Sequence, residues 1–432
     1  MAKYFDVIIV GAGPAGSLAA LKLARGGANV CLLERGKYPG AKNMFGGLLH
    51  NTPVLNEILP DFHERAPLER HVYRKSISFM TPRAAVALDF ENETFDKPPF
   101  NGYTVFRPAF DMWLAEEAVK AGALLSCECT AEDLIKKDGR IAGVTVKGRE
   151  GEIRGNIVIA ADGVLSFLAK KAGLRQDFKA ENMGVGIKLL LGFPEETINE
   201  RFHLVRDQGA DISFLGAMGD MRGGGFLYTN RESISIGLVT HLDSLKASGK
   251  APYEVLNDFL EHPSVKKLVK GGTPLEYSAH LIPEGGYKAI PNLFTGGLML
   301  AGDAAGLCYT NGLNLEGINL AMTSGALAGE TAIDALKAGD YSAKILSSYK
   351  KKLDESFVMK DMKTFKNAAA MMHLERLFRT YPRILANIME RVYKTDGVPR
   401  SKLLRLARKE ALKEAGLKGL ISDGFKIGRS LL

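Results

Sequence analysis

A glycine-rich turn near the start of the sequence has the spacing of a nucleotide-binding loop. It follows Tyr4–Val10, a stretch of β-branched and apolar residues that predicts a buried strand. The six residues of the turn are Gly11, Ala12, Gly13, Pro14, Ala15 and Gly16. The first glycine permits a tight turn, the second lets the backbone approach a pyrophosphate, and the third lets the following helix pack on the sheet.

The segments after this turn come in the order that a dinucleotide site needs. Ser17–Arg25 is rich in Ala and Leu and predicts a helix, whose N-terminal N–H groups and positive dipole would hold the phosphates. Asn29–Leu33 predicts a second strand, which ends at Glu34, 18 residues after Gly16. A carboxylate at about this spacing meets an adenosine ribose hydroxyl. The sequence therefore predicts a site for NAD or FAD.

Two later strands also end at an acidic residue with small neighbours. They are predicted over Ile157–Ala161 and Leu298–Ala301. The residues at their ends are Asp162, Gly163, Gly302 and Asp303. Such an Asp can hydrogen-bond a ribityl or ribose hydroxyl, and the small neighbours keep the ligand close to the backbone.

Two helix starts complete the predicted cofactor site. Arg107 precedes a helix expected over Phe110–Ala121 and is placed to reach a pyrophosphate oxygen. A long Ala-rich helix is predicted over Gly317–Leu336, and its N-terminus can stabilise electron density on a reduced flavin ring. The residues that lead into this helix are Gly312, Leu313 and Asn314.

Together these segments resemble the family of flavoproteins that includes aromatic hydroxylases, geranylgeranyl reductases and electron-transfer-flavoprotein quinone oxidoreductases. The resemblance covers almost the whole chain and implies FAD, bound extended, with its isoalloxazine ring between two domains. It also implies further cofactor contacts at Arg35, Lys42, Asn43, Met44, Gly46, Gly47 and Ala131.

Three other segments are similar to the quinone-oxidoreductase branch, and above all to FixC-like subunits of the Fix (electron-bifurcating) complexes. The segments are 40–47, 223–243 and 284–291. The resemblance places a quinone headgroup near Gly223, Gly224, Tyr228, Gly285 and Gly286. Each assignment has a plain alternative, because a Gly-rich turn and a buried tyrosine are also common structural features.

The same resemblance implies partners. The chain would pass electrons from the alpha and beta subunits of an electron-transfer flavoprotein to a membrane quinone. Mitochondrial relatives carry four cluster cysteines in a C-terminal ferredoxin-like segment, whereas residues 309–432 contain no cysteine. We therefore expect the iron–sulfur cluster on a separate ferredoxin-like subunit and no metal in this chain. Its four cysteines are Cys31, Cys127, Cys129 and Cys308.

Two other functions share the same fold and cofactor residues. One is an NAD(P)H-dependent prenyl (geranylgeranyl) reductase or an FAD monooxygenase, which would take hydride directly from NADPH. The other is a scaffold subunit with a structural FAD. Nucleic-acid binding is not expected, because the sequence has no binding motif and no aromatic residues interleaved with the basic ones.

The dispersed cofactor motifs predict an α/β fold in which one domain is inserted into another. A Rossmann-like FAD-binding domain is expected from residues 1–75, 104–170 and 290–340. Alternating apolar stretches predict an antiparallel-sheet substrate domain, with one helix at Tyr253–Leu260, from residues 76–103 and 171–289. Residues 341–432 predict a basic helical C-terminal region.

Composition and charge narrow the expected location. The 432 residues are 46% hydrophobic and 25% charged, as in folded proteins of two or three domains. Residues 341–432 hold 21 basic and 9 acidic side chains, within a chain of net charge +8. No uncharged apolar stretch reaches about 18 residues, and the start of the sequence lacks the layout of a signal peptide. We expect a peripheral protein on the cytoplasmic face of the cell membrane.

Lipid contact is expected from two segments. Lys363–Ile388 mixes apolar and basic residues, as in an interfacial helix, although a helix packed on its own core has the same pattern. By resemblance, Ile77–Pro99 would add to this surface. Cys308 is expected to be a small buried side chain near the flavin, with a redox-active thiol as the alternative. His50 lies near the flavin loop and is otherwise expected on the surface.

Overall fold

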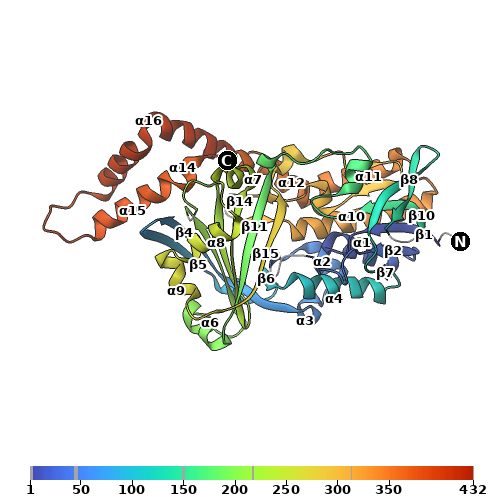
Figure 1. The fold of residues 1–432 in the computed structure, drawn as a ribbon, viewed down its shortest axis with the longest axis horizontal. Coiled ribbons are helices and arrows are strands. Elements are labelled where there is room, and N and C mark those ends of the chain that lie inside the picture. The colour runs from blue at the N-terminus through green and yellow to red at the C-terminus, as the bar shows by residue number, and fades with distance from the viewer. Residues whose placement is uncertain (1–2, 43–46, 148–150, 217, 313, 432) are drawn as a thin grey trace.

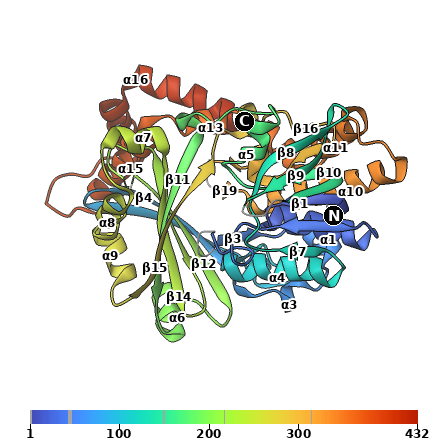
Figure 2. The same ribbon diagram turned by 45° about the vertical axis from the view of Figure 1, so that its right-hand side comes forward.

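The computed structural model describes residues 3–42, 47–147, 151–216, 218–312 and 314–431. Two β-sheets lie side by side, and a pair of C-terminal helices projects from the end formed by the second sheet (Figures 1 and 2). This arrangement confirms the predicted α/β fold with a Rossmann-like sheet, a second sheet and a helical C-terminal region.

The first sheet carries the dinucleotide turn. Its strands are β1 (Lys3–Val10), β2 (Val30–Leu33), β7 (Leu124–Ser126), β8 (Ala131–Lys137), β9 (Arg140–Val146), β10 (Glu152–Ala160), β16 (Phe294–Thr295) and β17 (Leu298–Leu300). The central pairs are parallel, in the order β17-β10-β1-β2-β7. β16 pairs with β17 at one edge and β9 pairs with the first residues of β10, both antiparallel. The central strands are buried on both faces, which is why they appear in the sequence as continuous apolar runs.

Helices pack against this sheet. The long ones are α1 (Pro14–Arg25), α4 (Arg107–Lys120) and α10 (Ile318–Ala338), and α1 packs against both of the others. The short ones are α2 (Pro53–Ile58), α3 (Phe62–Arg65) and α5 (Phe167–Lys171). A two-stranded ribbon of β18 (Tyr309–Thr310) and β19 (Leu315–Glu316) precedes α10. Cys127 and Cys129 follow β7 and do not lie in a strand.

The second sheet is larger and almost entirely antiparallel. Its strands are β3 (Gly47–His50), β4 (Leu68–Thr81), β5 (Ala84–Glu91), β6 (Gly102–Val105), β11 (Met183–Gly192), β12 (Gln208–Leu215), β13 (Gly223–Thr229), β14 (Ser233–His241) and β15 (Thr273–Pro283). The pair β12–β4 is parallel, which the predicted antiparallel sheet did not include. β3 comes from a segment assigned to the FAD-binding domain, and β6 straddles the predicted boundary between residues 103 and 104, but the two strands pair with each other in this sheet.

One face of the second sheet builds its own apolar core. Ile187, Leu227 and Leu238 pack there with Phe259 from α8 (Pro252–Leu260). The single helix predicted in this half is α8, but the prediction missed three others. They are α6 (Glu195–Phe202), α7 (Leu242–Ser248) and α9 (Pro263–Val269). Each is only two turns long, so its apolar periodicity is too short to detect.

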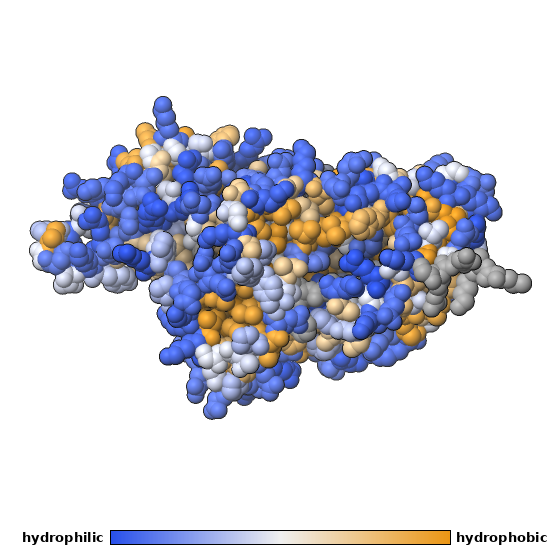
Figure 3. All heavy atoms as spheres, in the orientation of Figure 1, coloured by the Kyte–Doolittle hydropathy of each residue, from blue (hydrophilic) through white to orange (hydrophobic). Residues whose placement is uncertain are grey.

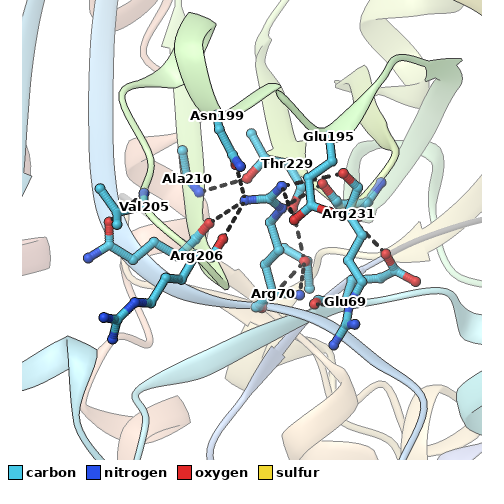
Figure 4. Close-up of polar contacts among 12 residues, drawn as sticks. Glu69, Arg70, Glu195, Asn199, Val205, Arg206, Ala210, Thr229 and Arg231 are labelled. Atoms are coloured by element: carbon cyan, nitrogen blue, oxygen red, sulfur yellow. Dashed lines mark hydrogen bonds and ion pairs between the residues drawn. The ribbon is translucent and has the colours of Figure 1, made fainter. Parts of the chain in front are cut away.

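A buried arginine forms hydrogen bonds to several segments at one end of this sheet (Figure 4). Arg70 of β4 is 1% exposed, and its Nε donates to the carbonyl oxygen of Asn230 at 2.7 Å. Its Nη1 donates to Asn199 Oδ1 at 2.7 Å and to the carbonyl oxygen of Gln208 at 2.8 Å. Arg70 therefore joins four segments that are distant in the sequence.

The C-terminal region consists of six helices. They are α11 (Ala343–Glu355), α12 (Phe357–Thr364), α13 (Ala368–Met371), α14 (Glu375–Phe378), α15 (Thr380–Tyr393) and α16 (Leu403–Leu431), which is kinked at Gly416. α15 packs against α16 and against β4 and β5. The interfacial helix expected over Lys363–Ile388 is wrong: the segment is divided among several helices, and its apolar side chains Met371, Phe378 and Ile384 are buried. No helix within the described ranges is long and apolar enough to cross a bilayer.

Candidate functional site

The turn between β1 and α1 has the geometry of a phosphate-binding loop. Gly11 has a φ of 101°, and a Cβ there would lie 2.3 Å from the carbonyl oxygen of Ala161. A Cβ on Gly16 would lie 1.9 Å from the carbonyl oxygen of Gly11. Gly13 is different, because a Cβ there would meet no atom within 4 Å. The first and third glycines are therefore needed by the fold, while the second borders open space.

The start of α1 is ready to bind an anion. Its N-cap residue is Gly13, no side chain caps the helix, and Pro14 is its first residue. The N–H groups of the first turn thus point at the open space beside Gly13, together with the positive end of the helix dipole. The structure therefore fits a pyrophosphate at this point.

Glu34 fixes the turn at the end of β2. Its Oε2 accepts from the backbone N–H of Ala12 at 3.1 Å, and its Oε1 accepts from that of Gly36 at 2.6 Å. The segment after β7 runs beside it, since the N–H of Cys129 donates to the carbonyl oxygen of Glu34. Ala131 follows at the start of β8. Arg35 and Lys42 are exposed. The predicted contacts Asn43, Met44, Gly46 and Leu313 lie outside the described residues.

Charged side chains gather where the first sheet ends. Arg107, the first residue of α4, is held by two hydrogen bonds to the buried Asp111, at 2.9 and 2.8 Å. The Asp162 carboxylate accepts a hydrogen bond from the Ser166 hydroxyl at 2.6 Å and thereby stabilises the turn that follows β10. Burial raises the pKa of Asp303. The nearby His280, Arg107 and Arg175 lower it, but by less than burial raises it. Gly163 and Gly302 both have positive φ, so each neighbours its Asp in a tight turn.

The loop before α10 closes the same region. Gly312 has a φ of 94° and donates its N–H to the Thr310 hydroxyl at 3.0 Å. The Asn314 N–H donates to Asn311 Oδ1 at 2.8 Å. α10 has Gly317 at its N-cap and no capping side chain, which leaves a second helix N-terminus with unsatisfied N–H groups. Gly47, at the start of β3, packs against the first turn of this helix.

A cavity of about 230 Å³ separates this region from the second sheet. Gly223, Gly224 and Tyr228 line it, as predicted for the quinone headgroup, and Gly312 and Asn314 reach it from the cofactor side. Gly285 and Gly286 do not line it, although the adjacent Glu284 does. Apolar walls come from Leu48, Phe214, Leu215, Phe226, Val239, Ile282, Leu315 and Met372.

Four ionisable residues of this cavity were missed from the sequence. They are Lys188, Asp211, His241 and Glu284. Lys188 belongs to the pattern Gly184-x-Gly186-x-Lys188, in which small and polar residues alternate with Val185 and Ile187 of the sheet core. Because side chains alternate between the faces of a strand, this pattern could have identified a strand with one polar face.

Burial shifts the pKa of several groups at the cavity. It lowers the pKa of Lys188 to about 7, and the nearby Arg107 adds to this effect. It raises the pKa of Glu284 to about 7. His241 has its pKa lowered to about 4 by burial and by the neighbouring His373 and Arg222. Each of these shifts favours the neutral form of a desolvated group.

Two further residues of interest lie in this part of the structure. His50, for which a surface position was the alternative to a role near the flavin loop, is half-buried; burial lowers its pKa, and its Nε2 is enclosed with no hydrogen-bond partner among the described residues. Cys308 is 3% exposed, and burial raises its pKa. This supports the hydrophobic role for Cys308, because a reactive cysteine needs an accessible thiolate. Among the described residues, no group of three or more His, Cys, Asp or Glu side chains could hold a metal ion.

Three segments of the chain match known protein families. Residues 6–183 match the FAD dependent oxidoreductase family, and residues 184–282 match the family described as ETF-QO, ubiquinone-binding. Residues 368–432 match the ETF-QO/FixC family C-terminal domain. The ubiquinone-binding match contains β11 to β15 except the first residue of β11 and the last residue of β15, and these strands supply most of the cavity.

Curated relatives match the chain over its full length. The probable electron transfer flavoprotein-quinone oxidoreductase YdiS of Escherichia coli (strain K12) is 42% identical over 98% of each chain. Protein FixC of Azotobacter vinelandii is 42% identical over 100% of each chain.

Among solved structures, a geranylgeranyl bacteriochlorophyll reductase-like protein from Thermoplasma acidophilum has a TM-score of 0.73. It shares 22% identity, over 98% of this chain and 100% of that one, so the likeness concerns the fold. The glycine turn, the uncapped start of α1 and the family matches agree on the cofactor. The chain is an FAD-dependent oxidoreductase that belongs to the ETF-QO/FixC family.

Proposed function

We propose that this protein takes electrons from an electron-transfer flavoprotein and passes them to a membrane quinone, as the FixC-type subunit of a multi-subunit complex. The cavity carries this proposal. It is mostly apolar, lies between the second sheet and the loop before α10, and is built from the strands that match the ubiquinone-binding family. The name of the relative YdiS supports both the donor and the acceptor.

FAD, when bound, supplies the redox chemistry, and the protein supplies binding, orientation and electrostatics. The start of α1 and the open space at Gly13 would hold the pyrophosphate. Glu34 would accept a hydrogen bond from the adenosine ribose, and Asp303 would accept one from the ribityl chain. The start of α10 would lie against the flavin ring, beside the cavity.

The membrane-facing surface would be the exposed end of the C-terminal helices, together with β5. Leu404 is 83% exposed at the start of α16, and Tyr393 is 74% exposed at the end of α15. Leu88 and Phe90 of β5 are also exposed, and α15 packs on that strand. The projecting end is mostly hydrophilic, with apolar patches at its tip and along its upper edge (Figure 3). Basic and apolar groups together suit an anionic bilayer surface on the cytoplasmic face.

The sequence also supports a proposal for the rest of the complex and for the domains. A ferredoxin-like subunit would carry the iron–sulfur cluster, because residues 309–432 contain no cysteine. The FAD-binding domain would comprise 1–75, 104–170 and 290–340 and the quinone domain 76–103 and 171–289, except that β3, the first residues of β4 and the last residues of β6 join the sheet of the quinone domain. The basic region 341–432 would serve the partners and the membrane.

An anaerobic absorbance experiment on the purified chain tests this function. NADH and NADPH are added separately, and the flavin is then reduced with dithionite and mixed with a short-chain quinone. We expect that neither nucleotide bleaches the flavin and that the quinone reoxidises it within the mixing time. Rapid bleaching by NADPH would instead show a prenyl reductase or monooxygenase.

Narrowing the cavity at Gly224 should weaken quinone use without affecting FAD. Gly224 has an ordinary φ, and its Cβ position lies 3.0 Å from the carbonyl oxygen of Phe214, so a Val side chain would crowd the cavity wall. We expect Gly224→Val to raise the KM for a short-chain quinone about ten-fold, since overpacking costs about 1–3 kcal/mol. Steady-state kinetics measure this effect, and an unchanged KM would place the quinone elsewhere.

A further inference from the structure

Two ionisable side chains reach the cavity from opposite ends of a strand face that carries two glycines. Gly184, Gly186 and Lys188 lie on one face of β11, because successive residues of a strand alternate between its faces. The Glu284 carboxyl lies over Gly184, where a Cβ would be 2.5 Å from its Oε2. Lys188 is four residues further along, which separates the Cα atoms of residues 184 and 188 by about 13 Å. This span leaves room for one ring over Gly186, with a polar group at each end.

Aromatic rings surround the lysine. Lys188 is 4% exposed, and its Nζ lies 5.4 Å from the ring centroids of both Phe226 and Tyr228. The two rings are stacked, 5.0 Å apart. The strand register brings them there, since Phe226 and Lys188 both pair with Gly237 of β14. A desolvated ammonium in such a site loses its proton more readily than one in water.

The Glu284 carboxyl is an acid at the other end. Among the described residues it has no hydrogen bond or ion pair, and burial is the cause of its raised pKa. A carboxyl group without a compensating cation stays neutral when it is desolvated. It therefore holds a proton up to about pH 7 and can donate it to an acceptor in the cavity.

We propose that Lys188 and Glu284 deliver the two protons consumed when a quinone is reduced in this cavity. The inference rests on the proposed function. The quinone gains two electrons from the reduced cofactor and two protons, one from the Lys188 ammonium and one from the Glu284 carboxyl, so both carbonyl groups become hydroxyls. Lys188 is left as a neutral amine and Glu284 as a carboxylate, and water protonates both again before the next turnover.

The pH dependence of quinone reduction should report both groups. Below about pH 7 both side chains hold their protons, and above it both lose them, so reduction should slow as the pH rises through 7. Removing one proton donor should slow quinone reduction by about 100-fold, within the range of general acid catalysis. The rate of the variant should also fall less steeply as the pH rises. Other titratable or charged groups include Asp211, Tyr228 and His241 in the cavity lining and Arg107, His280, Asp303, Cys308 and Glu316 around it.

The test compares Lys188→Gln and Glu284→Gln with the control Glu276→Gln. Glu276 lies on β15 and does not line the cavity. Each FAD-loaded protein is reduced anaerobically and mixed with a short-chain ubiquinone or with ferricenium, a one-electron acceptor that takes up no proton. We expect the two cavity variants to be slow with the quinone and normal with ferricenium, while the control is normal with both.

A readout independent of turnover completes the test. Infrared difference spectroscopy of the oxidised protein should show a protonated carboxyl band that titrates near pH 7 and is absent from Glu284→Gln but present in Glu276→Gln. Quinone reduction at the wild-type rate and pH dependence in both cavity variants would overturn the inference while leaving the proposed function intact. Failure of the wild-type protein to reduce quinone at all would instead overturn the proposed function.

Discussion

Gly13→Val is expected to give a folded protein that does not retain FAD. The backbone at Gly13 has a φ of −77° and a ψ of −174°, an extended conformation that valine adopts without strain. Its Cβ would meet no atom of the protein within 4 Å. The added methyl groups would therefore occupy only the space beside the start of α1 that the pyrophosphate needs.

We expect a large loss of FAD affinity, because no other contact can replace the close approach of the pyrophosphate to the backbone at Gly13. Overpacking costs about 1–3 kcal/mol, and each 1.4 kcal/mol is a factor of about ten in affinity. We expect FAD affinity to fall at least about ten-fold, measured by the flavin absorbance that co-purifies with the protein and by titration of the apoprotein. The thermal midpoint of the variant should equal that of wild-type apoprotein.

Gly16→Ala is the matched comparison. Its Cβ would lie 1.9 Å from the carbonyl oxygen of Gly11, so the helix would have to move away from the turn. This variant should lose both FAD and stability, whereas Gly13→Val should lose FAD alone. Full retention of FAD by Gly13→Val would show that the dinucleotide does not approach the protein at this turn.

Arg70→Met should destabilise the second half of the molecule by about 3–5 kcal/mol, as expected when one partner of a buried charged network is removed. The guanidinium donates to the carbonyl oxygens of Asn230 and Gln208 and to Asn199 Oδ1, all within 2.8 Å (Figure 4). Each acceptor left buried without a partner costs about 1–3 kcal/mol. The apolar substitution fills the volume but satisfies none of them.

Denaturant unfolding followed by circular dichroism measures this loss. Arg154→Met is the control, because Arg154 pairs with Glu152 in an exposed ion pair, which contributes about 0–1 kcal/mol. Equal stability losses in the two variants would contradict the role of Arg70. The flavin spectrum of Arg70→Met should be retained below its unfolding transition, since Arg70 contacts no residue of the predicted cofactor site.

The cofactor site could be predicted because its signals are local. The turn, the helix after it and the strand ending at Glu34 follow one another within about 30 residues, and each has a distinct pattern. The cavity is different. Lys188, Asp211 and Tyr228 come from three strands and Glu284 from the loop after a fourth, and only the register of the sheet brings them together.

The C-terminal region shows where periodicity misleads. The apolar residues of Lys363–Ile388 suited an interfacial helix, yet Met371 and Phe378 are buried against the rest of the chain. An amphipathic pattern shows that one face is apolar but not what covers that face. The exposed apolar residues of this region instead include Tyr393, Leu403 and Leu404, which lie outside that segment.

The most direct test of the account is electron flow through the complete path. An electron-transfer flavoprotein is reduced anaerobically and mixed with catalytic amounts of this protein and with vesicles of anionic lipid that contain quinone. We expect rapid oxidation of the flavoprotein and stoichiometric formation of hydroquinone, and we expect Gly13→Val to abolish both. Oxidation of the flavoprotein no faster than in the absence of this protein would contradict the central claim.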